Sequence, residues 1–428
     1  MINSSKEYRH ITADARFKQL PWYGWWIRSS LQSQLECCES GEIIEAVMGC
    51  SPSEKCKSWD AKFLPIWDSV KQQIQAPGDK SIRSITAHLI EAGLLSIASD
   101  YNALWAAEAL VFSLLGLHTL LFSADLAASL STGTLSIQDE TDGHRGEAHL
   151  CLAQPAARAR EHGLADLLLH FGMALPLANY CAADGPDEKR LFKQTRIVSP
   201  IDLDANLLAR FCGVRFAWTA SLSCHLELDR SAKVLYLFRY PSFCLAHISH
   251  PLSSEEEAHS TPIHSCVFEP SRQKGMVWGT AEDVTGLLRE TLLSYRLLFG
   301  QSKAARRLFL KELTPFAGVP TEGQDPLLAS LCGLKKLPRK WDVGGERAEY
   351  DLSEDFPHLR SRLVRLVGFA AEKKPRSLKE MWFDKRDSAS WMTFWTVLII
   401  GSLGLLLSFI QTVLQILQYV AALEENRK

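Results

Sequence analysis

The sequence predicts a mainly α-helical protein with a minor β component (α+β). A helical cytosolic domain containing a small β-hairpin or sheet would be followed by one C-terminal transmembrane helix. Three observations predict this. Apolar residues recur at helical spacing through most of the chain, β-prone residues cluster near 214–240, and the 36-residue window from Ser388 to Leu423 holds no charged residue.

Composition limits the class of protein. The chain has 428 residues, 46% of them hydrophobic, and a net charge of −2. Its mean hydropathy of −0.05 excludes a polytopic membrane protein. The balanced charge is not typical of a nucleic-acid binder, so we expect no nucleic-acid partner. The opening residues are polar and show no secretory signal, and the 11 cysteines are therefore expected to be reduced thiols.

Shifts in composition divide the chain into six expected segments. They are an aromatic- and cysteine-containing region at 1–78, a mainly helical core domain at 79–313 with a β-hairpin near 214–240, a linker or cover at 314–355, basic juxtamembrane helices at 356–387, a transmembrane helix at 391–420, and a short tail at 421–428.

The N-terminal half contains two notable elements. The first is an aromatic cluster after Pro21, made of Trp22, Tyr23, Trp25 and Trp26, which we expect to pack in a core, with a ligand platform as the alternative. The second is the apolar stretch 103–122. It carries a glutamate and a histidine that a membrane would penalise by several kcal/mol, so we expect it to be the central buried helix of the soluble part.

The middle of the chain mixes loops, helices and a hairpin. Residues 131–149 are polar and predict a solvated loop. Ser199 is expected to cap a helix that runs to Gly213, with Pro200 at its first position. Strands flanking Asp229 predict a hairpin, and the helix followed by a hairpin is compatible with a winged-helix-like unit. Val284 to Leu298 shows the spacing of an amphipathic helix.

The charge-free window is expected to be a membrane span. Phe394 to Val420 covers 27 residues, about 40 Å of helix against a bilayer core of about 30 Å. Aromatic residues lie near both ends, small residues lie along it, and glutamines recur in its second half. The residues expected to characterise the span are Phe394, Trp395, Gly401, Gly404, Ser408, Gln411, Gln415 and Tyr419.

Two alternatives stay open for this segment. Its glutamines are compatible with a homo-oligomer formed through the transmembrane helix, or with simple contact with interfacial water. The segment as a whole is alternatively a buried core helix of a soluble domain.

The charges flanking the span predict its orientation. His358 to Asp387 contains nine basic and four acidic residues, whereas only Arg427 and Lys428 are basic after the span. The positive-inside rule then places the N-terminal domain in the cytosol, as a single-pass, tail-anchored protein of an unspecified organelle. Its partners would be the lipid bilayer and an unknown protein.

No nucleotide-binding, hydrolase, metalloprotease or kinase motif occurs in the sequence. The best metal-ligand candidates are His247, His250, His259, His264 and Cys266, for which an exposed loop is the preferred interpretation. Cys224 and His225 are adjacent, so we expect them to point to opposite faces of a strand and not to act as a pair. We therefore expect no catalytic residue and no cofactor, and we leave enzymatic activity open while favouring its absence.

The C-terminal pattern W-x-D-x-R-D…W-x-x-FW…IIG…LS-x-IQ resembles that of an uncharacterised filamentous-fungal family. The pattern falls on Trp382, Asp384, Arg386, Asp387, Trp391, Phe394, Trp395, Ile399, Ile400, Gly401, Leu407, Ser408, Ile410 and Gln411. The resemblance spans roughly residues 80–425. It implies a single-span fungal membrane protein, some relatives of which are encoded in lineage-specific or subtelomeric gene clusters.

The expected function is that of a membrane-tethered protein that acts through protein interaction. The alternative is a membrane-associated accessory enzyme or a regulator of a lineage-specific gene cluster, serving secondary metabolism or colony and biofilm morphology.

Overall fold

The computed structural model is mainly helical with small sheets, which confirms the predicted fold class. It describes residues 20–36, 41–49, 59–78, 80–97, 101–173, 176–181, 185–248, 261–267, 279–313, 315–316, 318–333, 347–373 and 388–425. The chain forms two compact units, Met1–Ala370 and Ala371–Lys428. The first is a globular unit, and the described part of the second holds residues 371–373 and one long helix.

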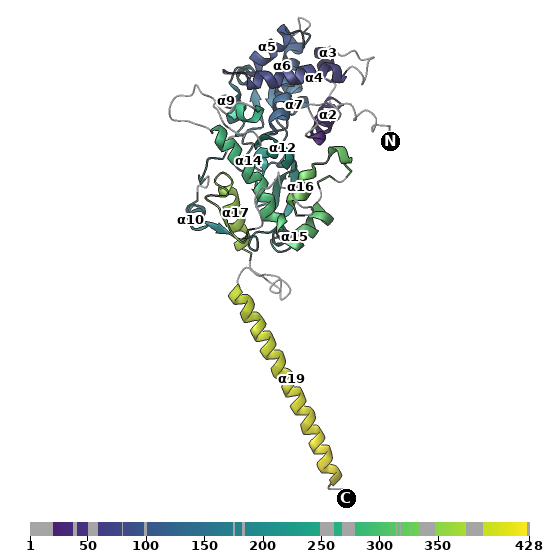
Figure 1. Ribbon diagram of the computed structural model, residues 1–428, viewed down its shortest axis with the longest axis vertical. Coiled ribbons are helices and arrows are strands. Elements are labelled where there is room, and N and C mark those ends of the chain that lie inside the picture. Colours follow the sequence, from purple (N-terminus) through teal and green to yellow (C-terminus); the bar gives the residue numbers. More distant parts are fainter. Residues whose placement is uncertain are drawn as a thin grey trace. The chain divides into compact units, whose positions relative to one another are not determined.

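The N-terminal half of the globular unit is built around α6 (Tyr101–Thr119). The helices α3 (Gly41–Val47), α4 (Trp59–Gln75) and α5 (Ile82–Glu91) pack against it (Figure 1). Side chains on every side of α6 between positions 105 and 117 are buried, as expected for a helix that is apolar all round. The predicted central buried helix is confirmed.

The glutamate and the histidine of α6 both have partners inside the core. The carboxylate of Glu108 is fully buried, and its Oε2 lies 3.3 Å from Nη1 of Arg160. Burial raises the pKa of Glu108, while the charge of Arg160 opposes that shift. His118 stacks on Trp67 and bonds to its carbonyl oxygen, 3.2 Å away, and burial lowers the pKa of His118 to about 3.

The aromatic cluster lies on α2 (Pro21–Glu36) and joins the two halves of the globular unit. Trp22 stacks face to face on Tyr240, with ring centroids 4.1 Å apart, and its Nε1 donates to Ser242. The hydroxyl of Tyr23 donates to the carbonyl of Leu117 at the end of α6. The expected core packing is confirmed for Trp22, Tyr23 and Trp26, all of which are buried.

The sheets are short, and one of them contains the predicted hairpin. The strand β6 (Val234–Phe238) pairs antiparallel with β5 (Leu228–Asp229) and parallel with β4 (Arg215–Thr219). Asp229 shapes the hairpin turn because its carboxylate accepts the backbone N–H groups of residues 231 and 232. The other pairs are β1 (Thr134–Ser136) with β2 (Ala153–Pro155) and β3 (Ile197–Val198) with β7 (Tyr350–Asp351).

The helix before the hairpin starts later than the sequence predicted. It is α11 (Ala205–Arg210), and its N-cap is Asp204, whose carboxylate accepts the N–H of Leu207. Ser199 and Pro200 belong instead to a turn closed by the bond from the N–H of Asp202 to the carbonyl of Ser199. The cap prediction at Ser199 was therefore wrong, because Asp204, five residues further on, caps the helix instead.

The C-terminal half of the globular unit centres on α14 (Ala281–Tyr295), which continues as a π-helical turn, η5 (Arg296–Gly300). It packs against α12 (Pro241–Ile248), α13 (Pro262–Val267) and α16 (Pro326–Leu331). The remaining described elements are α7 (Leu126–Thr132), α8 (Ala156–Ala159), α9 (Leu164–His170), α10 (Pro186–Gln194), η3 (Leu222–Cys224), α15 (Lys303–Leu308), η6 (Phe309–Leu313) and η7 (Thr321–Gly323).

The structure does not follow the expected boundary between the segments 314–355 and 356–387. The described part of 314–355 covers the globular unit, since α16 packs on α14 and β7 pairs with β3. The helix α17 (Arg360–Ala371) also belongs to the globular unit, where its Arg362 is buried. Residues 374–387 of the expected juxtamembrane segment lie outside the described residues.

The second unit contains α19 (Ser388–Glu425). Residues 392–423 form the one helical stretch in the described part of the chain that is long and apolar enough to cross a membrane. None of its apolar window is buried, and large side chains such as Leu405 and Phe409 are 76% and 68% exposed. A soluble core helix would bury this surface, as α6 does.

The ion pair between Glu108 of α6 and Arg160 gives a stability prediction. Arg160→Ala is expected to lower the free energy of unfolding by about 3 kcal/mol, because it leaves the carboxylate of Glu108 buried without a counter-charge. Adding Glu108→Gln should restore much of that loss. Thermal and urea unfolding of the full chain in mild detergent measures both. Arg158→Ala, which removes an exposed arginine two residues away, is the matched control, and an equal effect of the two alanine variants would contradict the prediction.

Candidate functional site

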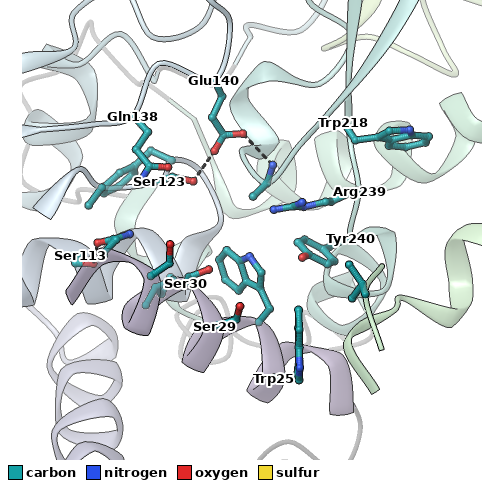
Figure 2. Close-up of a pocket in the computed structure, with 18 of the residues that line it drawn as sticks. Trp25, Ser29, Ser30, Ser113, Ser123, Gln138, Glu140, Trp218, Arg239 and Tyr240 are labelled. Carbon is teal, nitrogen blue, oxygen red and sulfur yellow. Dashed lines mark hydrogen bonds between the residues drawn. The ribbon is translucent and has the colours of Figure 1, made fainter. Parts of the chain in front are cut away.

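A pocket of about 360 Å³ opens in the globular unit between α2, the end of α6 and the sheet that carries β4 and β6 (Figure 2). Its volume lies within the range of small-molecule sites, roughly 300–1,000 Å³. Regions that are distant in the sequence form it: α2, the end of α6, the segment 122–140, residues 218–220, the residues that follow β6, and residues 316–319.

Aromatic rings form one side of this pocket. Trp26 and Tyr240 are buried, with ring centroids 5.6 Å apart, and Phe316 lies beside Tyr240 at 6.2 Å. Trp218 is held in place because its Nε1 donates to the carbonyl of Leu313 at 2.7 Å. The stack of Trp22 on Tyr240 supports the wall from behind, so these ring faces are fixed before any ligand arrives.

The carboxylate of Glu140 lines the pocket but is fully engaged by the protein. Its Oε1 accepts the hydroxyl of Ser123, and its Oε2 accepts the hydroxyl of Thr219 and the backbone N–H groups of Ala220 and Ser221. Figure 2 shows two of these bonds. Four donors leave little accepting capacity for a ligand, so Glu140 serves mainly to hold the loop after β4.

The guanidinium of Arg239 is the second charged group of the pocket. Unlike the carboxylate of Glu140, it is not saturated by protein partners in the described part of the chain. Its Cζ lies 5.0 Å from the ring centroid of Tyr240, within the range of a cation–π contact. No carboxylate of the described residues forms an ion pair with it, and its Nε has no protein acceptor. Arg239 is therefore a cation with hydrogen-bonding capacity left.

A cluster of potential nucleophiles lies behind the wall formed by Glu140. Nε2 of His149 is 3.1 Å from the hydroxyl of Ser221, and Nδ1 of the same ring is 3.5 Å from Sγ of Cys224. His225, the sequence neighbour of Cys224, instead bonds to Ser294. The expected separation of Cys224 from His225 agrees with this geometry, although both lie at a short 3₁₀ turn and not in a strand.

The electrostatics of this cluster are those of neutral groups. Burial raises the pKa of the Cys224 thiol and lowers the pKa of His149, while burial and then the charge of Arg362 lower the pKa of His225 to about 3. A catalytic thiolate–imidazolium pair needs shifts in the opposite direction. Ser221, Cys224 and His149 are also completely buried, so no substrate reaches them in this conformation.

The loop expected at 131–149 is only partly solvated. Asp142 is exposed, but His149 is buried and Glu140 is engaged as described. The interpretation of the whole loop as a solvated face was therefore wrong. No local signal marks these two residues, because their partners lie between 17 and 81 residues away in the sequence.

The metal candidates do not form a shared site in the described part of the chain. His247 bonds to the carbonyl of Phe243, and His264 lies between the hydroxyls of Thr261 and Thr285. Cys266 is buried, and His250 and His259 lie outside the described residues. No group of three or more histidine, cysteine or acidic residues suited to a metal ion occurs among the residues described.

The span residues predicted from the sequence all lie on α19, from Phe394 to Tyr419. Gly401 and Gly404 have open space where a side chain would be. Of the residues that carry the C-terminal sequence pattern, Trp382, Asp384, Arg386 and Asp387 lie outside the described residues.

Two candidate functional features therefore emerge, the pocket of the globular unit and the exposed apolar helix α19. Comparison of the chain with protein-family models, with curated proteins and with solved structures gives no match. Sequence reasoning identified α19 and singled out the aromatic cluster of α2 as core or ligand platform. It missed Arg239 and Glu140 as pocket residues.

The buried cysteine cluster gives a reactivity prediction. In the native full chain at pH 7.5, Cys224 is expected to resist iodoacetamide while the half-buried Cys151 and Cys181 react, because the reacting species is an accessible thiolate. In urea all three should react. Peptide mass spectrometry reads out each site, and modification of native Cys224 as fast as Cys151 would reveal an activated thiol and contradict a structural role.

Proposed function

We propose that this chain is a single-pass membrane protein whose globular unit acts by noncovalent interaction with a partner protein on the cytosolic side. The observation that carries the proposal is that no residue in the apolar window of α19 is buried. Fully burying one large aliphatic or aromatic side chain stabilises a protein by about 1.5–3 kcal/mol. A helix with many such side chains left in water needs a bilayer or a partner to cover it.

The length of α19 supports the bilayer as that cover. Residues 392–423 comprise 32 positions, about 48 Å of helix, which exceeds the hydrocarbon core of about 30 Å and allows for tilt. The backbone hydrogen bonds of a helix are satisfied within the segment itself, which is the requirement for crossing lipid. Its only polar side chains are uncharged.

The charges flanking the span support a cytosolic globular unit. Fewer basic residues contribute to this argument than the sequence alone indicated. Arg360, Arg362 and Arg365 bond within the globular unit and so contribute to its folding. Six basic residues are left between 373 and 386, against two in 424–428. The excess before the span still favours the cytosolic orientation.

The pocket supports binding over catalysis. Its ionisable side chains are Glu140, Arg239 and Tyr240, and the first is already engaged by four donors. Burial raises the pKa of Tyr240, which keeps its phenol protonated. An accessory enzyme would instead need accessible titratable groups poised for proton transfer or attack.

The anchor is tested by fractionation. Full-length protein is expected in the carbonate-resistant membrane pellet, whereas a chain ending at Asp387 should stay in the supernatant. Leu405→Arg at the middle of the span should reduce insertion, because an arginine costs about 2.5–3.5 kcal/mol at the centre of a transmembrane helix. Gln418→Arg, near the end, is the matched control with a smaller effect. Truncated protein that still sediments with membranes would refute α19 as the anchor.

The orientation is tested separately with glycosylation acceptor tags added to either end of the full chain in microsomes. A tag after Lys428 is expected to be glycosylated and a tag before Met1 is not. Replacing the six basic residues between 373 and 386 with glutamine should weaken this preference. The reverse pattern, with only the N-terminal tag modified, would place the globular unit on the lumenal side.

A further inference from the structure

We propose that the pocket of the globular unit binds a small organic anion, a carboxylate carried on a planar ring system, with Arg239 holding the carboxylate. This inference goes beyond the proposed function and does not depend on the membrane anchor. It rests on three properties of the described pocket residues: one uncommitted cation, preformed aromatic walls and a row of uncommitted hydroxyls.

The charge preference follows from the difference between Glu140 and Arg239. The four donors around Glu140 satisfy its carboxylate, so it offers little to a cationic ligand. Arg239 has no carboxylate partner in the described structure, and its Nε is shielded from solvent without a protein acceptor. A donor left without a partner inside a protein is unfavourable, so an acceptor that reaches the guanidinium is favoured.

The geometry of Arg239 suits a carboxylate in particular. Its guanidinium lies over the ring of Tyr240, which fixes one face of the group and leaves its edge for hydrogen bonding. A carboxylate accepts two parallel N–H groups from that edge, whereas a neutral carbonyl cannot match the charge. The backbone N–H of Arg239 donates to the carbonyl of Thr219, so the residue starts from a fixed strand end.

The aromatic walls predict the rest of the ligand. Trp26 and Tyr240 are buried and held by their neighbours, so their rings lose little freedom when a ligand binds. Flat apolar surface against such faces favours a planar ring, which gains offset or edge contacts. A pocket of about 360 Å³ has room for a ligand of two fused rings beside the carboxylate.

The hydroxyl row lies on α2 and adds polar contacts along the pocket. Ser29 and Ser33 are one helical turn apart, and Ser30 lies between them. No hydrogen bond joins the side-chain hydroxyls of these three serines to another described residue, so they are available to a ligand. Figure 2 shows Ser29 and Ser30 on α2 and Arg239 entering the pocket from a different side.

The test uses three naphthalene probes that share one ring system and differ in charge. Calorimetry with the full chain in an uncharged detergent compares 1-naphthoate, 1-naphthamide and 1-naphthylmethylammonium. We expect naphthoate to bind at least 10-fold more tightly than the other two. Equal affinities of naphthoate and naphthamide, or no measurable binding of naphthoate at millimolar concentration, would overturn the proposal.

Variants assign the preference to the pocket. Arg239→Gln should abolish the preference for naphthoate, and Arg239→Lys should keep part of it, since the charge stays and the planar fork is lost. Ser30→Phe should weaken all three probes by filling the pocket. Arg215→Gln removes an exposed arginine of β4 that does not line the pocket and should change nothing. If Arg239→Gln and Arg239→Lys both bind naphthoate as the unaltered chain does, Arg239 does not hold the carboxylate.

Discussion

The globular unit depends most on the ion pairs and hydrogen bonds that the buried guanidinium of Arg362 makes. It lies 3.2 Å from carboxylate oxygens of both Glu147 and Glu227 and donates to the carbonyls of Ser223 and His225. Burial alone would raise the pKa of Glu227, but Arg362, His144 and the N–H of Glu147 together hold it below its usual value. Leaving one partner of such a group alone costs about 3–5 kcal/mol, so three distant stretches of chain are fixed together.

The stretches of chain held together by Arg362 determine where the pocket forms. The turn held by Arg362 leads directly into β5 and β6, and Arg239 and Tyr240 follow the last residue of β6. On its other side the same turn begins at Ser221, whose N–H bonds to Glu140. The pocket therefore joins a saturated carboxylate and an uncommitted cation through one short sheet. The thiol of Cys224 and the imidazole of His149 behind this wall are neutral and buried.

The two units differ in whether their apolar helices are buried within the protein. Inside the globular unit, α6 buries its apolar surface and its one carboxylate has an arginine partner. In the second unit, α19 carries no charged side chain between Ser388 and Leu423 and buries none of its apolar window. In the hydrocarbon of a bilayer, apolar side chains are favourable on every face of a helix. A protein core tolerates a charged side chain if that side chain has a partner.

The sequence by itself determined the features that depend on local composition. These are the apolar helix 388–425, the buried helix α6 and the β5–β6 hairpin, since each is set by residues that are close in the sequence. The tertiary structure alone decided which helix buries Arg362, that His149 meets Cys224, and that α2, Glu140 and Arg239 share one pocket. These pairs lie 75 to 215 residues apart. Only packing brings such residues together, because no local pattern in the chain records the partner of a buried polar group.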